Sequence, residues 1–169
     1  MDVGASGGPD GARKGLSLMV GGNKKVYEKL TTLFEDLSLP GGFSYMGKSG
    51  AGHFVKMIHN GIEYGMMQSL AEGLELLKGK QEFALDLAQV TELWRNGSVV
   101  RSWLLDLTAE ALKTDQNLDK VAPYVPDSGE GRWTVIESVD QGVAAPVLTL
   151  ALQMRFNSQN ETGYGYRLL

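Results

Sequence analysis

The feature that most constrains the fold is a helical pattern that runs from Ala51 to about Leu77. A helix of about 26 residues is longer than most helices of globular proteins and would span about 40 Å. Three further helical patterns follow, at residues 82–96, 99–113 and 135–154, and no convincing strand signal interrupts them. The second part of the chain is therefore predicted to be all-helical, with the long helix as its spine.

The first part of the chain follows a different pattern. A short apolar run at residues 16–20 predicts a strand, residues 23–37 predict an amphipathic helix with Asn23 as its N-cap, and residues 43–46 predict a second strand. Strand, helix, strand is the order of a doubly wound α/β layer. We predict that residues 1–47 are the last piece of such a domain and that residues 48–169 form the helical domain, so the fold class is mainly α.

Composition excludes several classes of function. The chain has 169 residues, of which 43% are hydrophobic, and its net charge of −4 argues against a nucleic-acid partner. No apolar run approaches the roughly 18 residues of a membrane span. The absence of cysteine excludes disulfides and thiolate metal sites and suits the cytoplasm, where we place the protein. His53 and His59 are the only histidines and have no carboxylate at a recognised ligand spacing, so no metal site is predicted.

One side of the long helix carries five different polar groups: an amine, an imidazole, an amide, a carboxylate and a phenol. These side chains are Lys56, His59, Asn60, Glu63 and Tyr64. At about 100° per residue they lie within roughly 140° of the circumference, and the opposite side is apolar. A solvated face usually repeats Glu, Lys and Gln, so a reactive face and a solvated face both remain open. Lys56 and Glu63 are about 10 Å apart along the axis, too far for a local ion pair but suited to bracket a small molecule.

A phosphate-loop motif occurs outside the long helix. Residues 42–49 match G-x-x-x-x-G-K-[ST], but the interior of the motif is bulky and strand-like and a helix precedes it, so we do not predict a nucleotide loop. No G-x-G-x-x-G fingerprint stands at a strand–helix junction either.

Three other features of the sequence can be explained by ordinary structure as well as by ligand binding. Ser6, Gly7 and Gly8 form a flexible segment whose hydroxyl and amides suit an oxyanion or a sugar hydroxyl, although glycine-rich termini are more often simply loose. Arg155 ends an apolar helix, where a cation is favourable without any ligand. The three tryptophans are predicted to be core anchors. They are Trp94, Trp103 and Trp133.

Four segments together resemble the 6-phosphogluconate dehydrogenase family in its short bacterial form. They are DVGASGG, SLMVGG, GHFVKMIHNGIEYGMMQ and GRWTVIESVDQGVAAPVLTLALQMRFNSQ, and the similarity runs over nearly the whole chain. The family consists of β-hydroxyacid dehydrogenases with a Rossmann domain followed by an all-helical domain, usually dimeric or larger. The resemblance implies oxidative decarboxylation of 6-phosphogluconate to ribulose 5-phosphate in the pentose phosphate pathway, with NAD or NADP as cofactor, in a homodimer or higher homo-oligomer.

The resemblance also implies a role for each residue of the polar face. Lys56 matches the general base, which must be neutral to accept a proton, and Glu63 matches the acid that protonates the enediol carbon. His59 and Asn60 match groups that hold substrate hydroxyls and orient the nicotinamide, so Asn60 also counts as a cofactor-binding residue.

The remaining predicted contacts hold the two ends of the sugar acid. Ser6, Gly7 and Gly8 match the loop that grips the carboxylate end. Tyr64 and Arg155 match contacts to the phosphate, for which a guanidinium fork is well suited.

The sequence departs from the longer family members in two ways. Ser128 and Glu130 stand where those members carry a lysine and a threonine, and a carboxylate there would repel a phosphate. The glycine fingerprint of the Rossmann domain, and an arginine and a histidine of the longer members' tail, have no match in the chain. We therefore expect the substrate and catalytic half of an enzyme that is active when joined to its Rossmann half, and the alternative is a non-catalytic helical oligomerisation module or a truncated inactive homologue.

Overall fold

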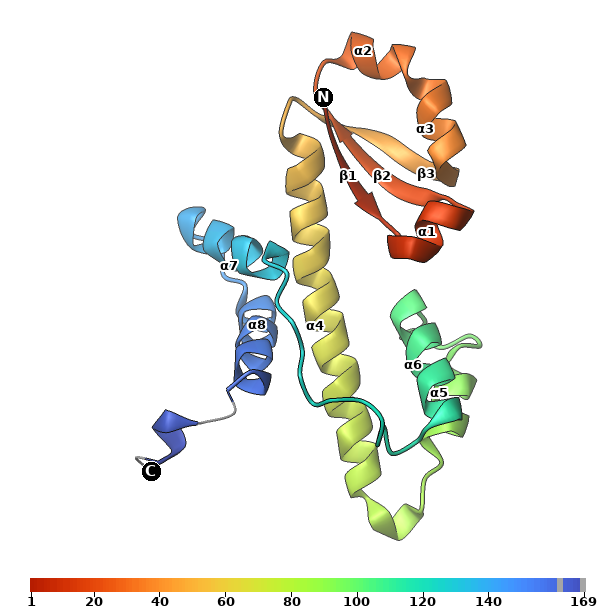
Figure 1. Ribbon diagram of the computed structural model, residues 1–169, viewed down its shortest axis with the longest axis vertical. Helices are drawn as coiled ribbons and strands as arrows, with labels where there is room; N and C mark the ends of the chain where they lie inside the picture. Colours follow the sequence, from red (N-terminus) through yellow and green to blue (C-terminus); the bar gives the residue numbers. More distant parts are fainter. Residues whose placement is uncertain (161–162, 168–169) are drawn as a thin grey trace. The chain divides into compact units, whose positions relative to one another are not determined.

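The computed structural model describes residues 1–160 and 163–167 (Figure 1). The strands are β1 (Asp2–Ser6), β2 (Leu16–Gly21) and β3 (Ser38–Gly47). The helices are α1 (Gly8–Lys14), α2 (Lys24–Lys29), α3 (Thr31–Leu37), α4 (Ala51–Gly79), α5 (Leu87–Trp94), α6 (Trp103–Thr114), α7 (Glu130–Asp140) and α8 (Pro146–Ser158), with 3-10 turns at Gln81–Phe83 and Tyr164–Arg167. The predicted mainly-α fold class is confirmed.

The chain forms two compact units. The first contains Met1–Ile62 and Gly129–Ala144, and the second contains Glu63–Ser128 and Ala145–Leu169. The α4 helix continues from the first unit into the second. The predicted division between residues 47 and 48 separates two domains of the sequence rather than these two compact units, and it stays a prediction.

The first unit is built on a three-stranded sheet in the order β1-β2-β3. β2 and β3 are parallel and follow the predicted strand–helix–strand order, but two helices, α2 and α3, join them where one helix over residues 23–37 was predicted. β3 begins at Ser38 rather than Phe43 and passes through Pro40, where its pairing with β2 is irregular. Residues 42–47 of the phosphate-loop match therefore lie in a strand, which excludes a phosphate loop there.

The first strand and helix were not predicted. β1 pairs antiparallel with β2 over the whole of Asp2–Ser6, and α1 follows directly. This segment is rich in glycine and alanine and lacks the β-branched alternation that marks a strand. Its extended conformation depends on backbone pairing with β2, which local composition does not reveal.

The core of the first unit is small and aromatic. Leu18, Val20 and Phe34 are buried, and Tyr27 and Phe43 pack against them. The Tyr27 ring lies 5.7 Å from the Phe34 ring, and the Phe34 ring lies 5.9 Å from the Phe43 ring, so α2 and α3 cover β2 and β3 through these side chains. Asn23 caps α2 as predicted, accepting from the N–H groups of Lys25 and Val26. Phe34 is buried, whereas four other apolar side chains of residues 23–37 are exposed; these are Val26, Leu30, Leu33 and Leu37.

The long helix α4 ends two residues beyond the prediction, at Gly79. Asp2 closes its N-terminus, since one carboxylate oxygen accepts from Gly50 N–H at 2.7 Å and the other from His53 N–H at 2.9 Å. The hydrogen bond from His53, followed by that from Gly50, lowers the pKa of the Asp2 carboxyl below its usual 3.8. A strand of the sheet and the start of α4 are thereby joined through one side chain.

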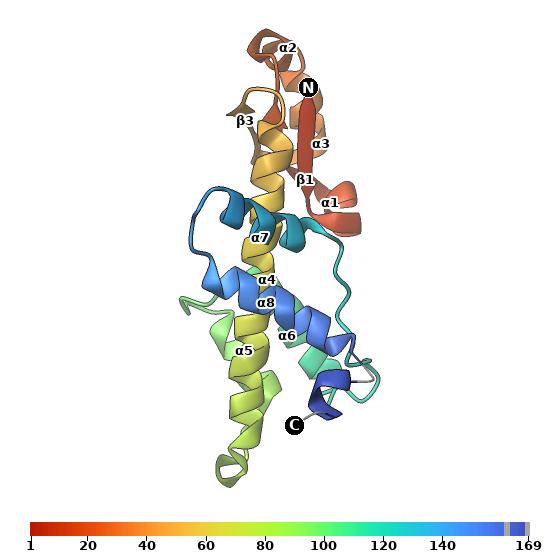
Figure 2. The same ribbon diagram turned by 90° about the vertical axis from the view of Figure 1, so that its left-hand side faces the viewer.

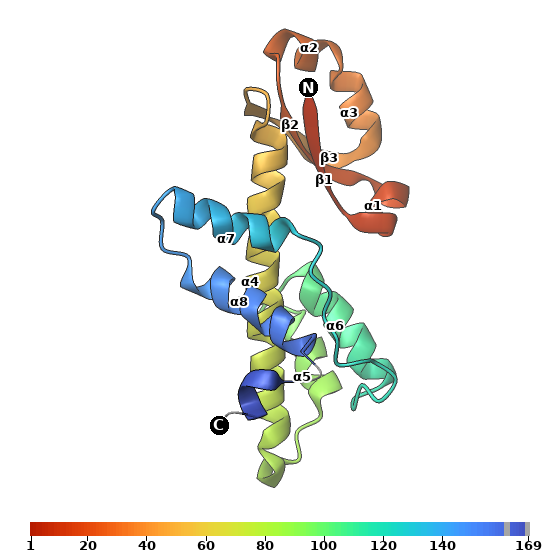
Figure 3. The same ribbon diagram turned by 60° about the vertical axis from the view of Figure 1, so that its left-hand side comes forward.

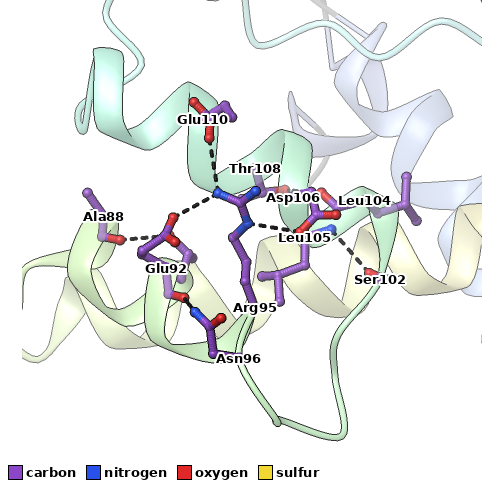
Figure 4. Close-up of polar contacts among 11 residues, drawn as sticks. Ala88, Glu92, Arg95, Asn96, Ser102, Leu104, Leu105, Asp106, Thr108 and Glu110 are labelled. Atoms are coloured by element: carbon purple, nitrogen blue, oxygen red, sulfur yellow. Dashed lines mark hydrogen bonds and ion pairs between the residues drawn. The ribbon is translucent and has the colours of Figure 1, made fainter. Parts of the chain in front are cut away.

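The second unit contains a hairpin of α5 and α6. Asp86 caps α5 through Gln89 N–H and Ser102 caps α6 through Leu105 N–H, so both helices begin later than the sequence pattern suggested. Arg95 joins the two helices through three carboxylates (Figure 4): those of Glu92, Asp106 and Glu110, at 2.8, 2.9 and 3.0 Å. The bonds to Glu92 and then to Asp106 raise the pKa of the Arg95 guanidinium.

The helical pattern at residues 135–154 is two helices instead of one. α7 and α8 are separated by Gly142, whose φ is 68°, and Pro146 begins α8. Trp103 and Trp133 are 53% and 54% exposed, so the prediction that they anchor the core was wrong, while Trp94 is half-buried.

A search of the described helices for a membrane span found none that is long and apolar enough.

Candidate active site

Four of the predicted site residues come together in the first unit. Lys56 Nζ donates to the amide oxygen of Asn60 and lies 3.4 Å from His59 Nδ1. The same imidazole nitrogen lies 3.2 Å from the Asn60 oxygen, and His59 Nε2 lies 3.5 Å from Ser6 Oγ. All four residues are partly buried. We call Ser6, Lys56, His59 and Asn60 the amine cluster.

Local structure explains how the amine cluster forms. Lys56, His59 and Asn60 are spaced by three and four residues, which places them on one face of α4. Ser6 is the last residue of β1, and the chain turns there, because Gly7 has a φ of 135° as the N-cap of α1 and Gly8 has a φ of 55°. Both glycines adopt backbone conformations that other residues rarely take. Gly7 and Gly8 thus shape the turn that follows the serine.

One residue that supports the cluster was missed in the sequence. A methyl group on Gly4 would lie 2.8 Å from the carbonyl oxygen of Gly52 and 3.1 Å from Lys56 Cγ, and closer still to Lys56 Cβ. β1 therefore packs directly on the stem of the lysine. The available signal was the glycine inside DVGAS, because an isolated glycine in a strand often marks close approach of another backbone.

The amine cluster can bind hydroxyl groups and move protons. An amine can act as a base when neutral, and the imidazole stands between that amine and a serine hydroxyl. The amide of Asn60 adds both a donor and an acceptor. Such a set suits a polyhydroxylated substrate in which one hydroxyl loses its proton.

A second group of predicted residues comes together in the second unit. The Arg155 guanidinium carbon lies 3.4 Å from the centroid of the Tyr64 ring, and Arg155 Nη1 donates to the Pro126 carbonyl at 2.7 Å. The Tyr64 hydroxyl donates to Asp127 Oδ1 at 3.5 Å, lies 3.3 Å from Ser128 Oγ and accepts from Ser128 N–H at 3.4 Å. The tyrosine is 5% exposed. We call Tyr64 and Arg155 the stacked pair; Asp127, which contacts it, was not predicted.

The two glutamates of opposite predicted effect, Glu63 and Glu130, lie on α4 and α7. Glu63 is on α4, partly buried, and its role as the acid stays a prediction. Glu130 begins α7 and accepts through its backbone carbonyl from the Thr134 hydroxyl at 2.8 Å. Among residues 1–160 and 163–167, no group of three or more metal-ligating side chains is placed to hold a metal ion.

Two family profiles match the chain. Residues 52–163 match the C-terminal domain of 6-phosphogluconate dehydrogenase, and residues 1–47 match the NAD binding domain of 6-phosphogluconate dehydrogenase. Together with the sheet and the long polar-faced helix, these matches define the class: an oxidoreductase chain in which part of a nucleotide-binding domain leads into a helical domain.

Individual relatives agree with the profiles. A Bacillus subtilis protein named as a candidate 6-phosphogluconate dehydrogenase is 46% identical over 158 residues, covering 94% of this chain and 53% of the relative. An NAD(+)-dependent, decarboxylating 6-phosphogluconate dehydrogenase of Haloferax volcanii is 44% identical over 170 residues, covering 99% of this chain and 56% of the relative. A solved 6-phosphogluconate dehydrogenase of Plasmodium falciparum, studied with its cofactor NADP+ and its substrate 6-phosphogluconate, has a TM-score of 0.83 at 34% identity and covers 93% of this chain and 36% of that chain.

The chain belongs to the 6-phosphogluconate dehydrogenase family. It spans about half the length of the two curated relatives named above.

Proposed function

We propose that the protein supplies the substrate-binding and catalytic half of an NAD(P)-dependent 6-phosphogluconate dehydrogenase. The reaction is the oxidative decarboxylation of 6-phosphogluconate to ribulose 5-phosphate. The observation that carries the proposal is the amine cluster, because a lysine, a histidine and an asparagine on one helix meet a serine hydroxyl in a chain of this family.

In this mechanism the chain moves two protons. Lys56, as the neutral amine, accepts the proton of the substrate 3-hydroxyl as carbon 3 loses a hydride and becomes a ketone. The carbon–carbon bond to the carboxylate then breaks, carbon dioxide leaves, and the electron pair of that bond forms an enediolate. Glu63 gives a proton to the carbon that lost the carboxylate, which yields ribulose 5-phosphate.

Binding groups act at both ends of the sugar acid in this proposal. The Ser6 hydroxyl and the backbone of Gly7 and Gly8 hold the carboxylate end, and His59 holds hydroxyls. Tyr64 and Arg155 hold the phosphate, with the ring fixing the plane of the guanidinium through the 3.4 Å stack.

The family implies a nicotinamide cofactor, and the donor set of the amine cluster fits part of it. The cofactor supplies the acceptor for the hydride. The Asn60 amide carries both a donor and an acceptor, which is the complement of a carboxamide, and would orient the nicotinamide. Since residues 1–47 match an NAD binding domain, we propose NAD or NADP as the cofactor.

The test is formation of ribulose 5-phosphate and reduced cofactor by the purified protein, joined to its nucleotide-binding half where turnover requires it. Lys56→Ala and Glu63→Gln should each reduce turnover by about 100-fold or more, the usual contribution of a general base or acid. Lys78→Ala and Glu75→Gln are matched controls, because both residues are exposed on the same helix. If both Lys56→Ala and Glu63→Gln keep wild-type turnover, the assigned roles are wrong.

A second candidate function, a helical oligomerisation module, is favoured by exposed apolar side chains on α7. Trp133, Ile136 and Val139 recur every three residues and are 54%, 51% and 74% exposed. Such a row suits burial against a second copy of the chain. Calorimetry with 6-phosphogluconate separates the two candidates, because binding that is lost in Arg155→Ala contradicts a purely structural role.

A further inference from the structure

We propose that Thr134 and Gly61 are a positioning pair for the turn of α4 that carries the amine cluster. Neither residue was singled out in the sequence as part of a site. The inference rests on the proposed function, in which this turn holds the base and the groups that bind substrate hydroxyls.

The first observation is a hydrogen bond between two helices. Thr134 on α7 is 3% exposed, and its Oγ1 lies 2.8 Å from the carbonyl oxygen of Met57 on α4 and 2.8 Å from that of Glu130 on its own helix. Figures 2 and 3 show α7 crossing α4. Because Met57 directly follows Lys56, α7 is bonded to α4 next to the proposed base.

The second observation is that the crossing admits only glycine on α4. A methyl group on Gly61 would lie 2.6 Å from Thr134 Cγ2, 2.9 Å from its Oγ1 and 3.0 Å from its Cβ. The threonine thus sits in a notch that the glycine leaves open. If the hydroxyl turned away to relieve such a clash, a buried donor would lose its acceptors, which is costly.

The third observation concerns the other side of the same segment. Gly4 on β1 packs on the stem of Lys56, and Gly52 packs on the backbone of β1 and β2. Residues 52–61 of α4 are therefore held by close contacts with the backbone of the sheet and with the Thr134 side chain of α7. A change at the α7 contact must displace the turn that holds His59 and Asn60, and displacements of about 1 Å can reduce catalysis by about 100-fold.

The test uses four variants of the protein. Gly61→Ala fills the notch, and Thr134→Val keeps the shape but removes the hydroxyl. Thr134→Ser keeps the hydroxyl and removes the methyl group that would clash most closely. The double variant Gly61→Ala/Thr134→Ser should therefore restore much of what Gly61→Ala loses.

The matched control is Thr91→Val. Thr91 is 0% exposed and its hydroxyl donates only within its own helix among the described contacts, to the carbonyls of Leu87 at 2.8 Å and Ala88 at 3.2 Å. The substitution makes the same chemical change at similar burial, at a hydroxyl whose described hydrogen bonds stay within α5.

One readout does not depend on activity. The sequence has two histidines, His53 and His59, so the ring-proton NMR signals of His59 can be assigned with a His53→Gln variant. Gly61→Ala and Thr134→Val should move the His59 signals, Thr134→Ser and the double variant should return them toward their wild-type positions, and Thr91→Val should leave them unchanged. Turnover should follow the same order, with a loss of about 10- to 100-fold in Gly61→Ala.

The inference is overturned if Thr134→Val and Gly61→Ala leave the His59 signals at their wild-type positions, or if the double variant is no better than Gly61→Ala. Where Gly61→Ala does not fold, the His59 signals of Thr134→Val are compared with those of Thr91→Val, and a shift in Thr134→Val alone supports the inference. If the wild-type protein forms no product even when joined to its nucleotide-binding half, the proposed function fails, and the His59 signals alone decide this inference.

Discussion

Replacing Gly52 by alanine tests whether the start of α4 is seated on the sheet as described. A methyl group there would lie 2.8 Å from the Asp2 carbonyl oxygen and 2.8 Å from the Gly21 nitrogen, and closer still to the Met19 carbonyl oxygen. Ordinary van der Waals contact begins at 3.4 Å, so two of these contacts fall short by about 0.6 Å. All three neighbours are backbone atoms, which cannot rotate away, and α4 would have to retreat from the sheet.

The expected cost follows from these contacts. Overpacking a well-packed site costs about 1–3 kcal/mol. Withdrawal of the helix also stretches the bonds from Gly50 and His53 to Asp2, and loss of a helix cap costs about 1 kcal/mol. Alanine gains about 1 kcal/mol of helix propensity over glycine. We expect Gly52→Ala to lower the free energy of unfolding by about 1–3 kcal/mol.

The assay is urea denaturation followed by circular dichroism. With a slope of about 2 kcal/mol per molar urea, the midpoint should fall by roughly 0.5 to 1.5 M. Gly73→Ala is the matched control on the same helix, because a methyl group at Gly73 meets nothing within 4 Å, and it should stabilise by about 1 kcal/mol. A Gly52→Ala protein as stable as the wild type would show that the close seating of α4 on the sheet is wrong.

Three further predictions concern a pH dependence, a core side chain and a ligand. Because the pKa of Asp2 is lowered in the folded state, its contribution to stability is present above pH 3.8 and is lost as the pH falls through the lower folded pKa. Asp2→Asn lacks this contribution and should be less stable than the wild type at neutral pH. In thermal melts from neutral to acidic pH, its melting temperature should therefore fall by less than that of the wild type. Leu105→Ala, at a fully buried position, should cost about 2–5 kcal/mol in urea denaturation, and Leu107→Ala, 54% exposed on the same helix, should cost less than about 1 kcal/mol. Arg155→Lys keeps the charge but loses the guanidinium that lies over the Tyr64 ring, so the dissociation constant of 6-phosphogluconate should rise roughly tenfold in calorimetry. An unchanged dissociation constant would contradict the role of Arg155 in binding the phosphate.

Parts of the fold with a strong periodic signal could be predicted from the sequence. The long α4 helix and the β2 strand were placed within two residues of their ends. β1 could not be predicted, because its residues have no strand pattern and only pairing with β2 extends them. The break between α7 and α8 was missed, although Gly142 and Pro146 mark it, because apolar residues continue on both sides.

For the candidate site, sequence reasoning selected the side chains of the amine cluster but not the residues that support them. The spacing of Lys56, His59 and Asn60 placed them on one face of α4, and the structure brings them together with Ser6. Gly4 and Thr134 were missed, because each acts through contacts with an element distant in sequence. The glycine inside DVGAS was the available signal for Gly4, whereas nothing in a single sequence distinguishes Thr134 from the other threonines.

The carboxylate of Asp2 has a consequence for the order in which the protein folds. It lies 48 residues before the first amide that it accepts from, so at a synthesis rate of about 5–20 residues per second β1 leaves the ribosome about 2 to 10 seconds before its partner does. β1 and β2 are both synthesised before Gly50, so their pairing can form before Asp2 accepts from the N–H groups of Gly50 and His53. In a stalled-ribosome series of increasing length, we expect the β1–β2 pairing to appear at shorter chain lengths than the capping of α4 by Asp2.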